Sequence, residues 1–385
     1  MTVRVEITPQ VIEWAVERSG KDISDFKHQV SDWVAGTKKP TTKQLREFAS
    51  WAAVPEGYLY LDTPPDEEIA VPDYRTRSGS PVRRPSPELI DTVHDMELRQ
   101  DWMRNHLLSL GAAELDFVGS YTKRDRPEEV AAAIRSQLDL AADWARSCST
   151  TEKARQRIRE AIGAAKILTF LNSVVGNNTS RKLDSDEFQG FVLVDRVAPL
   201  IFVNTADSVS AQIFTLAHEI AHLWLGESAL FRVDPAAVES DTPELESFCN
   251  RVAAEFLVPK ESLAFNWVET GNLSEDLRRT AKRYKVSPIV IGRRLKDLRR
   301  LDDDRFFKFY ADYKKEARKP RKKDSGGGSF YQNQNMRLDP RFGRYVVNAV
   351  AEGGLTYRKA YTLTRLKGSV FESYAQSVSE GGADE

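Results

Sequence analysis

Cysteine and long apolar runs are scarce in this chain of 385 residues. Its two cysteines, Cys148 and Cys249, are far apart in sequence, so we expect neither a disulfide framework nor a cysteine-rich metal site. Charged residues interrupt every apolar stretch well before the roughly 18 residues that a membrane-spanning helix needs. The first ten residues, MTVRVEITPQ, lack the apolar core of a signal peptide. These absences favour a cytoplasmic protein with no membrane partner.

Net charge is also almost absent, because 56 Lys and Arg residues face 57 Asp and Glu residues. The balance excludes a chain that is basic throughout, but it conceals a local excess. Residues 278–323 hold 19 basic and 6 acidic residues, a net charge of +13, which leaves −14 elsewhere within the total of −1. Such a region favours DNA, another nucleic acid or an acidic protein as partner, and a merely solvated basic face is the alternative. The candidate contacts are Arg278, Arg279, Lys282, Arg283, Arg293 and Arg294.

Residues 1–62 have the pattern of a small helical unit. Apolar residues recur at helical spacing in three short segments: after Pro9, from Ile23 to Trp33, and after Pro40. Short helices with tight connections are typical of a helix-turn-helix module. The unit has 8 basic and 9 acidic residues, however, and DNA binding depends on neutralising phosphates. Docking to a protein or a structural role is therefore the stronger expectation.

The rest of the chain predicts a mainly helical α+β protein with a small sheet. Residues 63–85 are a Pro-rich extended linker and 86–265 a central domain, with helices expected over 86–110, 127–144, 151–164, 208–225 and 243–257. The apolar runs Gly190–Asp195 and Pro199–Asn204 predict two neighbouring strands. Residues 266–317 form a basic helical region resembling a second helix-turn-helix pair, 318–329 a Gly-rich flexible linker, and 330–385 a small C-terminal helical unit.

The segment FTLAHEIAHLWLG, residues 214–226, contains the pattern HExxH. On a helix, His218 and His222 lie one turn apart on the same face, so both imidazoles can bind one tetrahedral metal. Glu219 is rotated by about 100° from His218, which suits a general base beside the metal. The pattern predicts a hydrolytic zinc site, where the metal lowers the pKa of water to about 7. The alternatives are a chance match and two core histidines that have ordinary hydrogen-bond partners.

A third zinc ligand is expected from the next helix, ESFCNRVAAEFLVP, residues 246–259. Glu246 shares one face with Cys249 and Asn250, which follow it at three and four residues. Spacing favours Glu246 over Glu255, although either could be a solvated charge. Cys249 could supply a thiolate, but a fourth protein ligand would close the site to water, so a small buried residue is the preferred interpretation.

At these residues the chain resembles the ImmA/IrrE-type zinc metallopeptidases that carry an N-terminal XRE-like helix-turn-helix. The two helical motifs above are the most specific part of the resemblance. Gly190–Phe191 with 198–204, the stretches YLYLDTPP and VPDYRT within 58–76, and GGGSFYQ at 326–332 extend it over most of the chain. The resemblance implies a zincin-like core over 86–265, an XRE-like module over 1–62, and Glu246 as the third zinc ligand.

The function implied by the resemblance is cleavage of a regulatory protein, most plausibly a cognate helix-turn-helix repressor. Stress response, control of mobile elements or phage, and toxin-antitoxin-like systems are the contexts it suggests. Glu219 would remove a proton from water and return it to the leaving amine, while a strand at 190–195 or 199–204 would pair with the substrate backbone. Two alternatives remain, a DNA-binding transcriptional regulator with a sensor-like peptidase fold and an antirepressor that binds without cutting.

Overall fold

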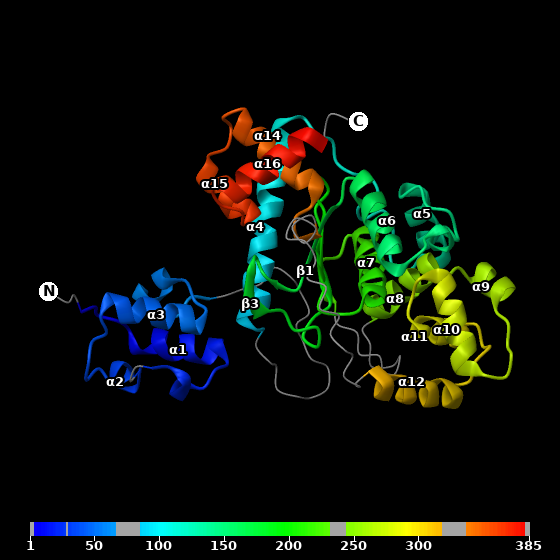
Figure 1. Cartoon of the computed structure of the whole chain (residues 1–385), viewed down its shortest axis with the longest axis horizontal. Coiled ribbons are helices and arrows are strands. Elements are labelled where there is room, and N and C mark those ends of the chain that lie inside the picture. The colour runs from blue at the N-terminus through cyan, green and yellow to red at the C-terminus, as the bar shows by residue number, and fades with distance from the viewer. Residues whose placement is uncertain (1–3, 28–29, 67–84, 232–243, 318–335, 382–385) are drawn as a thin grey trace.

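The computed structural model describes residues 4–27, 30–66, 85–231, 244–317 and 336–381. It is an α+β protein, mainly helical with a small mixed sheet, as the sequence predicts. Figure 1 shows the N-terminal helices at one end, the sheet in the middle, and the helices that follow the HExxH segment at the other end. The linkers expected over 63–85 and 318–329 lie largely or wholly outside the described residues. No helix of the described part is long and apolar enough to cross a bilayer.

The N-terminal unit is helical and has a core of its own. Three aromatic side chains, Phe26, Trp33 and Phe48, pack at its centre, with Phe26 and Phe48 ring centroids 5.5 Å apart. One expected helix is different, because the segment from Ile23 to Trp33 holds a short 3₁₀ turn, capped by Asp22 through Ser24 N–H, and a separate helix that begins at Val30. The elements are α1 (Pro9–Ser19), the 3₁₀ helix η1 (Ile23–Asp25), α2 (Val30–Val34), α3 (Thr42–Ala52) and the 3₁₀ helix η2 (Glu56–Tyr60).

A four-stranded sheet in the order β1-β5-β4-β6 forms the centre of the molecule. The two expected strands are present as an antiparallel pair, in which Phe191 faces Phe202. β1 pairs in parallel with β5, and β6 pairs antiparallel with β4. A separate two-stranded ribbon joins β2 and β3. The strands are β1 (Leu168–Asn172), β2 (Val174–Val175), β3 (Asn178–Lys182), β4 (Gly190–Leu193), β5 (Leu200–Asn204) and β6 (Ala229–Phe231).

Helices cover both faces of the sheet, so successive residues of one strand enter different cores. Val192 of β4 packs in the core that contains the HExxH helix, whereas Phe191 and Leu193 pack in the core on the opposite face. Strands that are buried on both faces are apolar throughout rather than alternating. This is the reason that β4 and β5 appear in the sequence within short apolar runs.

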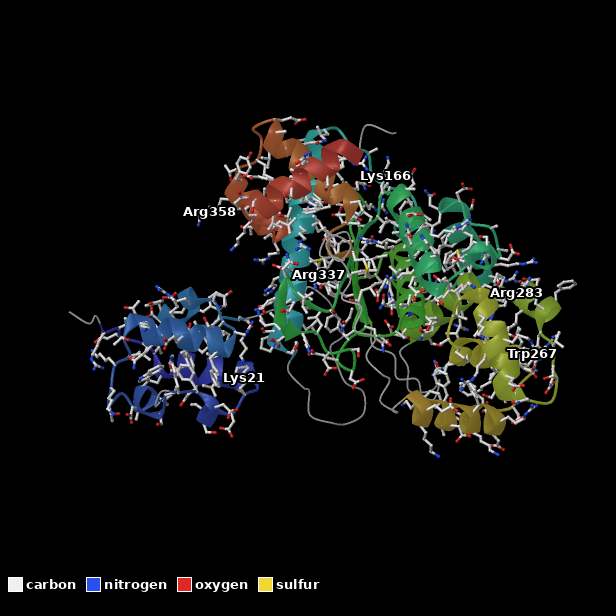
Figure 2. All side chains as sticks on the ribbon, in the orientation of Figure 1. Lys21, Lys166, Trp267, Arg283, Arg337 and Arg358 are labelled. Carbon is white, nitrogen blue, oxygen red and sulfur yellow. The ribbon has the colours of Figure 1, made fainter. Side chains whose placement is uncertain are left out.

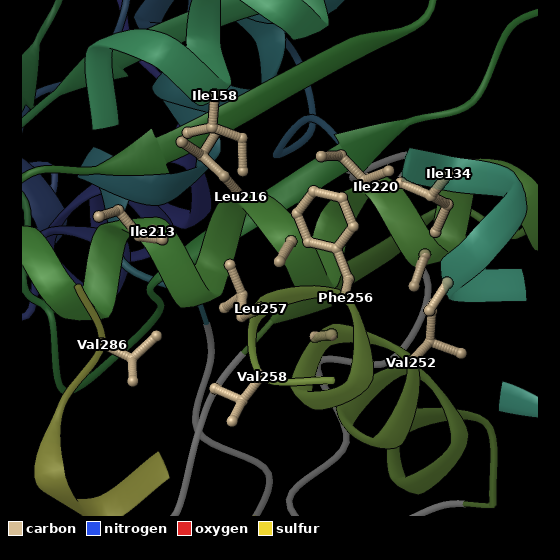
Figure 3. Close-up of a cluster of buried hydrophobic side chains, with 14 of the residues drawn as sticks. Ile134, Ile158, Ile213, Leu216, Ile220, Val252, Phe256, Leu257, Val258 and Val286 are labelled. Atoms are coloured by element: carbon tan, nitrogen blue, oxygen red, sulfur yellow. The ribbon is translucent and has the colours of Figure 1, made fainter. Parts of the chain in front are cut away.

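The HExxH helix α7 (Val209–Leu225) lies between the sheet and the helix α8 (Glu244–Leu257). Figure 3 shows Leu216 and Ile220 of α7 packed with Ile158 of α6 and Phe256 of α8. The remaining elements of this half are α5 (Pro127–Gln137), the 3₁₀ helix η3 (Trp144–Ser147), α6 (Thr151–Ala164), α9 (Lys260–Asn266), α10 (Leu273–Tyr284), α11 (Pro288–Asp297) and α12 (Asp303–Ala317).

One predicted helix in this half has a different boundary. The helix expected over 127–144 ends at Gln137, and Asp139 adopts a positive φ of 49° immediately after it. The basic region contains two successive helices, as expected, because Lys285 takes a left-handed conformation at the end of α10 and Ser287 caps a new helix at Pro288.

The C-terminal unit forms the second helical layer of the sheet instead of a separate appendage. It comprises α14 (Pro340–Ala351), α15 (Tyr357–Thr364) and α16 (Ser369–Gly381), which lie beside the long helix α4 (Pro87–Ser109) in Figure 1. Phe342 of α14 stacks edge-on against Phe170 of β1, with ring centroids 5.5 Å apart. The carboxylate of Asp339 caps α14 through Phe342 N–H at 2.9 Å and also accepts from Thr169 N–H of β1 at 3.0 Å. One buried side chain therefore joins this unit to the sheet edge.

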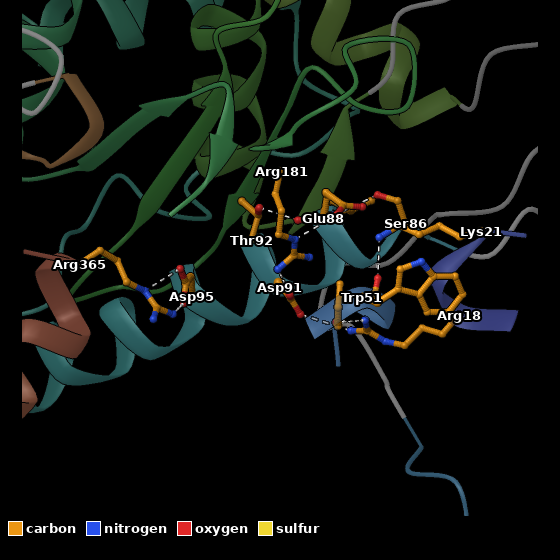
Figure 4. A network of polar contacts seen from close by, with 12 residues as sticks. Arg18, Lys21, Trp51, Ser86, Glu88, Asp91, Thr92, Asp95, Arg181 and Arg365 are labelled. Carbon is orange, nitrogen blue, oxygen red and sulfur yellow. Dashed lines mark hydrogen bonds and ion pairs between the residues drawn. The ribbon is translucent and has the colours of Figure 1, made fainter. Parts of the chain in front are cut away.

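Ion pairs along α4 join the outer units to the centre (Figure 4). Asp91 accepts from Arg18 of the N-terminal unit at 3.3 Å and from Arg181 of β3 at 2.6 Å. Arg18 also donates to the carbonyl of Ala53 at 2.7 Å. Asp95, one turn further along α4, pairs with Arg365 after α15. Because Arg18 is nearly buried and binds across the unit boundary, the contact favours docking of the N-terminal unit on the protein itself.

Asp339→Ala should lower the free energy of unfolding by about 2–4 kcal/mol, because it removes a helix cap and leaves the buried Thr169 N–H without an acceptor. Urea denaturation would measure the loss. Thr356→Ala is the matched control, since Thr356 caps α15 by accepting from Lys359 N–H at an exposed position, and we expect about 1 kcal/mol or less there. Equal losses in the two variants would contradict the structural role given to Asp339.

Candidate metal centre

Local sequence signals place the two histidines at the middle of a buried helix. Ser208 caps the start of α7 by accepting from Ala211 N–H, and Gly226 ends it in a left-handed conformation with φ of 72°. His218 and His222 are fully buried and lie on the same face, as their spacing predicts, with their Nε2 atoms 3.0 Å apart. Neither imidazole ring is exposed to water, so each ring nitrogen needs a hydrogen-bond partner or a metal inside the protein.

Helix α8 brings Glu246 to the same point. One carboxylate oxygen, Oε2, lies 3.1 Å from His218 Nε2, and the other, Oε1, lies 3.3 Å from His222 Nε2. These three residues are the group of potential metal ligands that converges in the described part of the chain. The structure thus brings together the three residues that the sequence analysis nominated as ligands.

Asn250, one turn after Glu246, fixes the orientation of His218. Its side-chain oxygen Oδ1 lies 3.1 Å from His218 Nδ1. In the tautomer that carries its proton on Nδ1, that N–H donates to Asn250 and the Nε2 lone pair is directed at Glu246 and His222. An outer partner of this kind is usual for a histidine that binds a metal. The spacing of four residues predicts that Asn250 shares a helix face with Glu246, but it does not predict the contact of Asn250 with His218.

The donor set fits a zinc ion. Two imidazole nitrogens and a carboxylate meet at one point, and no cationic side chain is among them. Two histidines with one carboxylate are a known catalytic zinc set, which leaves a fourth position for water or substrate. A divalent cation would also remove the clash of acceptor lone pairs that the converging atoms otherwise create.

Burial and pairing shift the pKa values of these groups in opposite directions. Burial lowers the pKa of His218 to about 4, although its contacts with Glu246 partly offset that effect. For Glu246, burial alone would raise the pKa, but contacts with His218 and His222 outweigh it and hold the pKa below its usual range. The neutral imidazole and the ionised carboxylate are the forms that bind metals.

Glu219 is fully buried beside this group but belongs to no hydrogen bond or ion pair with the described residues. Both of its carboxylate oxygens are inaccessible to solvent and without a partner there. Burial, together with the negative charge of Glu246, raises the pKa of Glu219 well above its ordinary value. A carboxyl group with a raised pKa and no partner is suited to take up and release a proton.

Gly190 of β4 allows the sheet to approach this carboxylate. A Cβ atom at Gly190 would lie 2.5 Å from Thr215 Cγ2, 2.8 Å from the carbonyl oxygen of Phe202 and 3.3 Å from Glu219 Oε1. Only glycine fits so close to a neighbouring helix and strand. The strand backbone therefore passes directly beside the candidate base.

Two other candidate ligands have different surroundings. Glu255 pairs with Arg294 in a buried contact, and its Oε1 also accepts from Lys260 N–H at 3.3 Å. Cys249 is buried in the apolar core, and burial raises the pKa of its thiol well above the ordinary value. Neither belongs to the converging group, which leaves Glu246 as the third residue.

The strand-pairing expectation requires a correction. Either Gly190–Asp195 or Pro199–Asn204 was expected to offer an edge to a substrate backbone. In the structure β5 lies between β1 and β4, and β4 lies between β5 and β6, so neither strand has an open edge. The three-residue strand β6, too short to stand out in the sequence, takes the position beside β4.

The basic residues expected to contact a partner do not form one free surface. Arg294 was wrong as a surface contact, because its guanidinium is buried against Glu255. Arg278 pairs with Glu316 at 2.5 Å and Arg279 with Asp276 at 2.8 Å. Lys282 is exposed, and Arg283 and Arg293 are half-buried. Figure 2 places Arg283 and Trp267 together at the end of the molecule that holds α9 to α12.

Comparison with known families agrees with this geometry over part of the chain. Residues 163–296 match the IrrE N-terminal-like domain of the Peptidase_M78 family, which supports the expected ImmA/IrrE relationship and a peptidase domain there. The matched region includes His218, Glu219, His222 and Glu246. Residues 338–377 match a domain of unknown function, DUF8813, which coincides with the C-terminal layer on the sheet. No curated protein matches the chain.

Asn250→Ala should weaken zinc binding by about 10–100-fold, because His218 loses the acceptor that fixes its ring. Competition with a chelator of known affinity would measure this. Asn250→Asp is the matched control, because it keeps an oxygen acceptor at the same place, and it should bind zinc more tightly than the alanine variant. Wild-type affinity in Asn250→Ala would show that His218 is oriented by other contacts.

Proposed function

We propose that the protein is a zinc-dependent endopeptidase that cleaves a regulatory protein. One observation carries the proposal: an unpartnered buried carboxylate, Glu219, lies beside two imidazoles and a carboxylate that converge on one point. The match to a peptidase domain over 163–296 supports it. Purely structural histidines would not require a carboxylate in contact with both imidazoles, nor a second acidic group beside them without a partner.

His218, His222 and Glu246 would hold the metal. When bound, zinc supplies Lewis-acid activation of water and of the peptide carbonyl. Glu219 accepts the proton that water loses as it attacks the carbonyl carbon, and then donates that proton to the amine that leaves. Its raised pKa suits both steps, since the same carboxyl group must take up and release a proton. Asn250 keeps the His218 ring in the required orientation.

The proposed substrate is a helix-turn-helix repressor in a stress-response, mobile-element or toxin-antitoxin-like system. Resemblance to the ImmA/IrrE family supports this substrate class. Residues 163–296 are the part of the chain that the family model matches. A non-cleaving antirepressor and a DNA-binding regulator would use the same fold without needing Glu219 as a base. The variants below separate these functions.

Glu219→Gln should retain zinc but reduce repressor cleavage by at least about 10²–10⁴-fold, because the amide keeps the size of the side chain and cannot accept the proton. Cleavage of a purified repressor and zinc content per chain would be measured together. Wild-type cleavage by this variant would exclude Glu219 as the base. Tight binding of an intact repressor by the wild type would favour the antirepressor.

Glu246→Ala should lose zinc and activity together, as should His222→Ala, because each removes a ligand. Glu244→Ala is the matched control on the same helix, since Glu244 is exposed and pairs with Lys123 at 2.6 Å. That control should keep both zinc and activity. A Glu246→Ala protein with full zinc content would assign the third ligand elsewhere.

The basic region between 278 and 323 is proposed to bind DNA or an acidic face of the partner, with the exposed Lys282 among its contacts. Lys282→Glu should weaken binding to a nucleic-acid partner and reduce the slope of log affinity against log salt by about one or more. Lys367→Glu, at an exposed position in the C-terminal layer, should leave that slope unchanged. Equal slopes for the wild type, Lys282→Glu and Lys367→Glu would place the contact on another surface.

A further inference from the structure

The backbone of β4 directs hydrogen-bonding groups toward β6 at two positions. Asn204 N–H of β5 donates to the carbonyl of Gln189 at 2.8 Å, which marks one side of the strand. Val194 N–H donates in the other direction, to Ser228 Oγ at 3.0 Å. In an antiparallel strand, the backbone N–H and C=O groups of successive residues point to alternate sides. Gly190 and Val192 therefore turn these groups toward β6.

The strand β6 occupies these positions. Gly190 pairs with Phe231, Phe191 with Leu230 and Val192 with Ala229. Three residues, beginning with Gly226, separate the end of α7 from the start of this strand. A segment of the same chain therefore covers the edge nearest to the candidate base.

The candidate metal centre has little solvent exposure in this arrangement. His218, Glu219 and His222 have no solvent exposure, and Glu246 keeps about a fifth of its side-chain surface. Gly190, whose backbone faces β6, is also the residue whose Cβ would lie 3.3 Å from Glu219 Oε1. An extended peptide paired with Gly190 and Val192 would pass beside that carboxylate, at the place that β6 now takes.

We propose that β6 holds the position of an extended substrate backbone, so that the protein is latent until β6 leaves β4. The inference rests on the proposed peptidase function and deepens it. The substrate class it defines is a segment able to become extended and run antiparallel to β4. A three-residue edge strand is among the least stable parts of a sheet, so binding of the substrate protein can displace it.

A reversible cross-link between the two strands tests this directly. Val192 and Ala229 form a pair of the hydrogen-bonded kind, for which Cα atoms lie about 5.5 Å apart, a separation that suits a disulfide. The double variant Val192→Cys/Ala229→Cys would be compared with itself before and after reduction. The native Cys148 and Cys249 are both buried, and mass spectrometry of peptides would verify the intended bond.

Two readouts are taken on the zinc-loaded protein, repressor cleavage and the rate at which a chelator removes zinc. We expect the oxidised form to cleave at least about tenfold more slowly and to release zinc more slowly than the reduced form. Equal cleavage by both forms would overturn the inference and leave the peptidase proposal intact. If neither form cleaves but oxidation still slows zinc release, peptide hydrolysis fails whereas closure by β6 stands. Equal zinc release in both forms overturns closure.

Proline substitutions open the same contact without a disulfide. Ala229→Pro removes an N–H that points toward β4, so cleavage and zinc release should both accelerate. Leu230→Pro is the matched control, because the alternation turns the N–H of Leu230 to the outer edge, where proline is tolerated. Acceleration confined to Ala229→Pro supports the inference. Acceleration by both variants, or by neither, contradicts a specific role for the β4–β6 hydrogen bonds.

Discussion

Burial of α7 on all sides is the constraint on which the rest of this structure depends. The sheet covers one face of the helix and α8 covers another, so His218, Glu219 and His222 have no access to water. Polar groups in such a place are costly unless each finds a partner. Asn250 and Glu246 supply partners for His218, whereas the Glu219 carboxylate has none among the described residues. The chemistry proposed for the site follows from that imbalance.

The sheet connects this site to distant parts of the chain. Alternate residues of β4 face α7 on one side and the C-terminal layer on the other, so the two cores share one thin element. Asp339 fastens the C-terminal layer to β1, and β1 pairs with β5, which in turn supports β4. The domain of unknown function at 338–377 thus completes the fold that positions Gly190 beside Glu219.

Local signals in the sequence determined most helix boundaries on the two faces. Ser86, Thr150 and Ser208 cap α4, α6 and α7, and these helices begin where those caps predict. Prediction was weaker where the backbone turns without glycine, as at Asp139 after α5. Strand β1 also escaped prediction, because an apolar run that directly follows a helix has no turn residue to mark its start.

The sequence by itself determined that His218 and His222 share a helix face with Glu219 beside them, because a helix fixes the geometry of residues one turn apart. It also ranked Glu246 ahead of Glu255 without excluding either. Only the tertiary structure decided between them, since the buried charge of Arg294 is met by Glu255, and α8 turns Glu246 toward the histidines. The pairing of β4 with β6 likewise could not be predicted from the sequence, because strand pairing depends on register and on neighbouring strands, which a local sequence pattern does not specify.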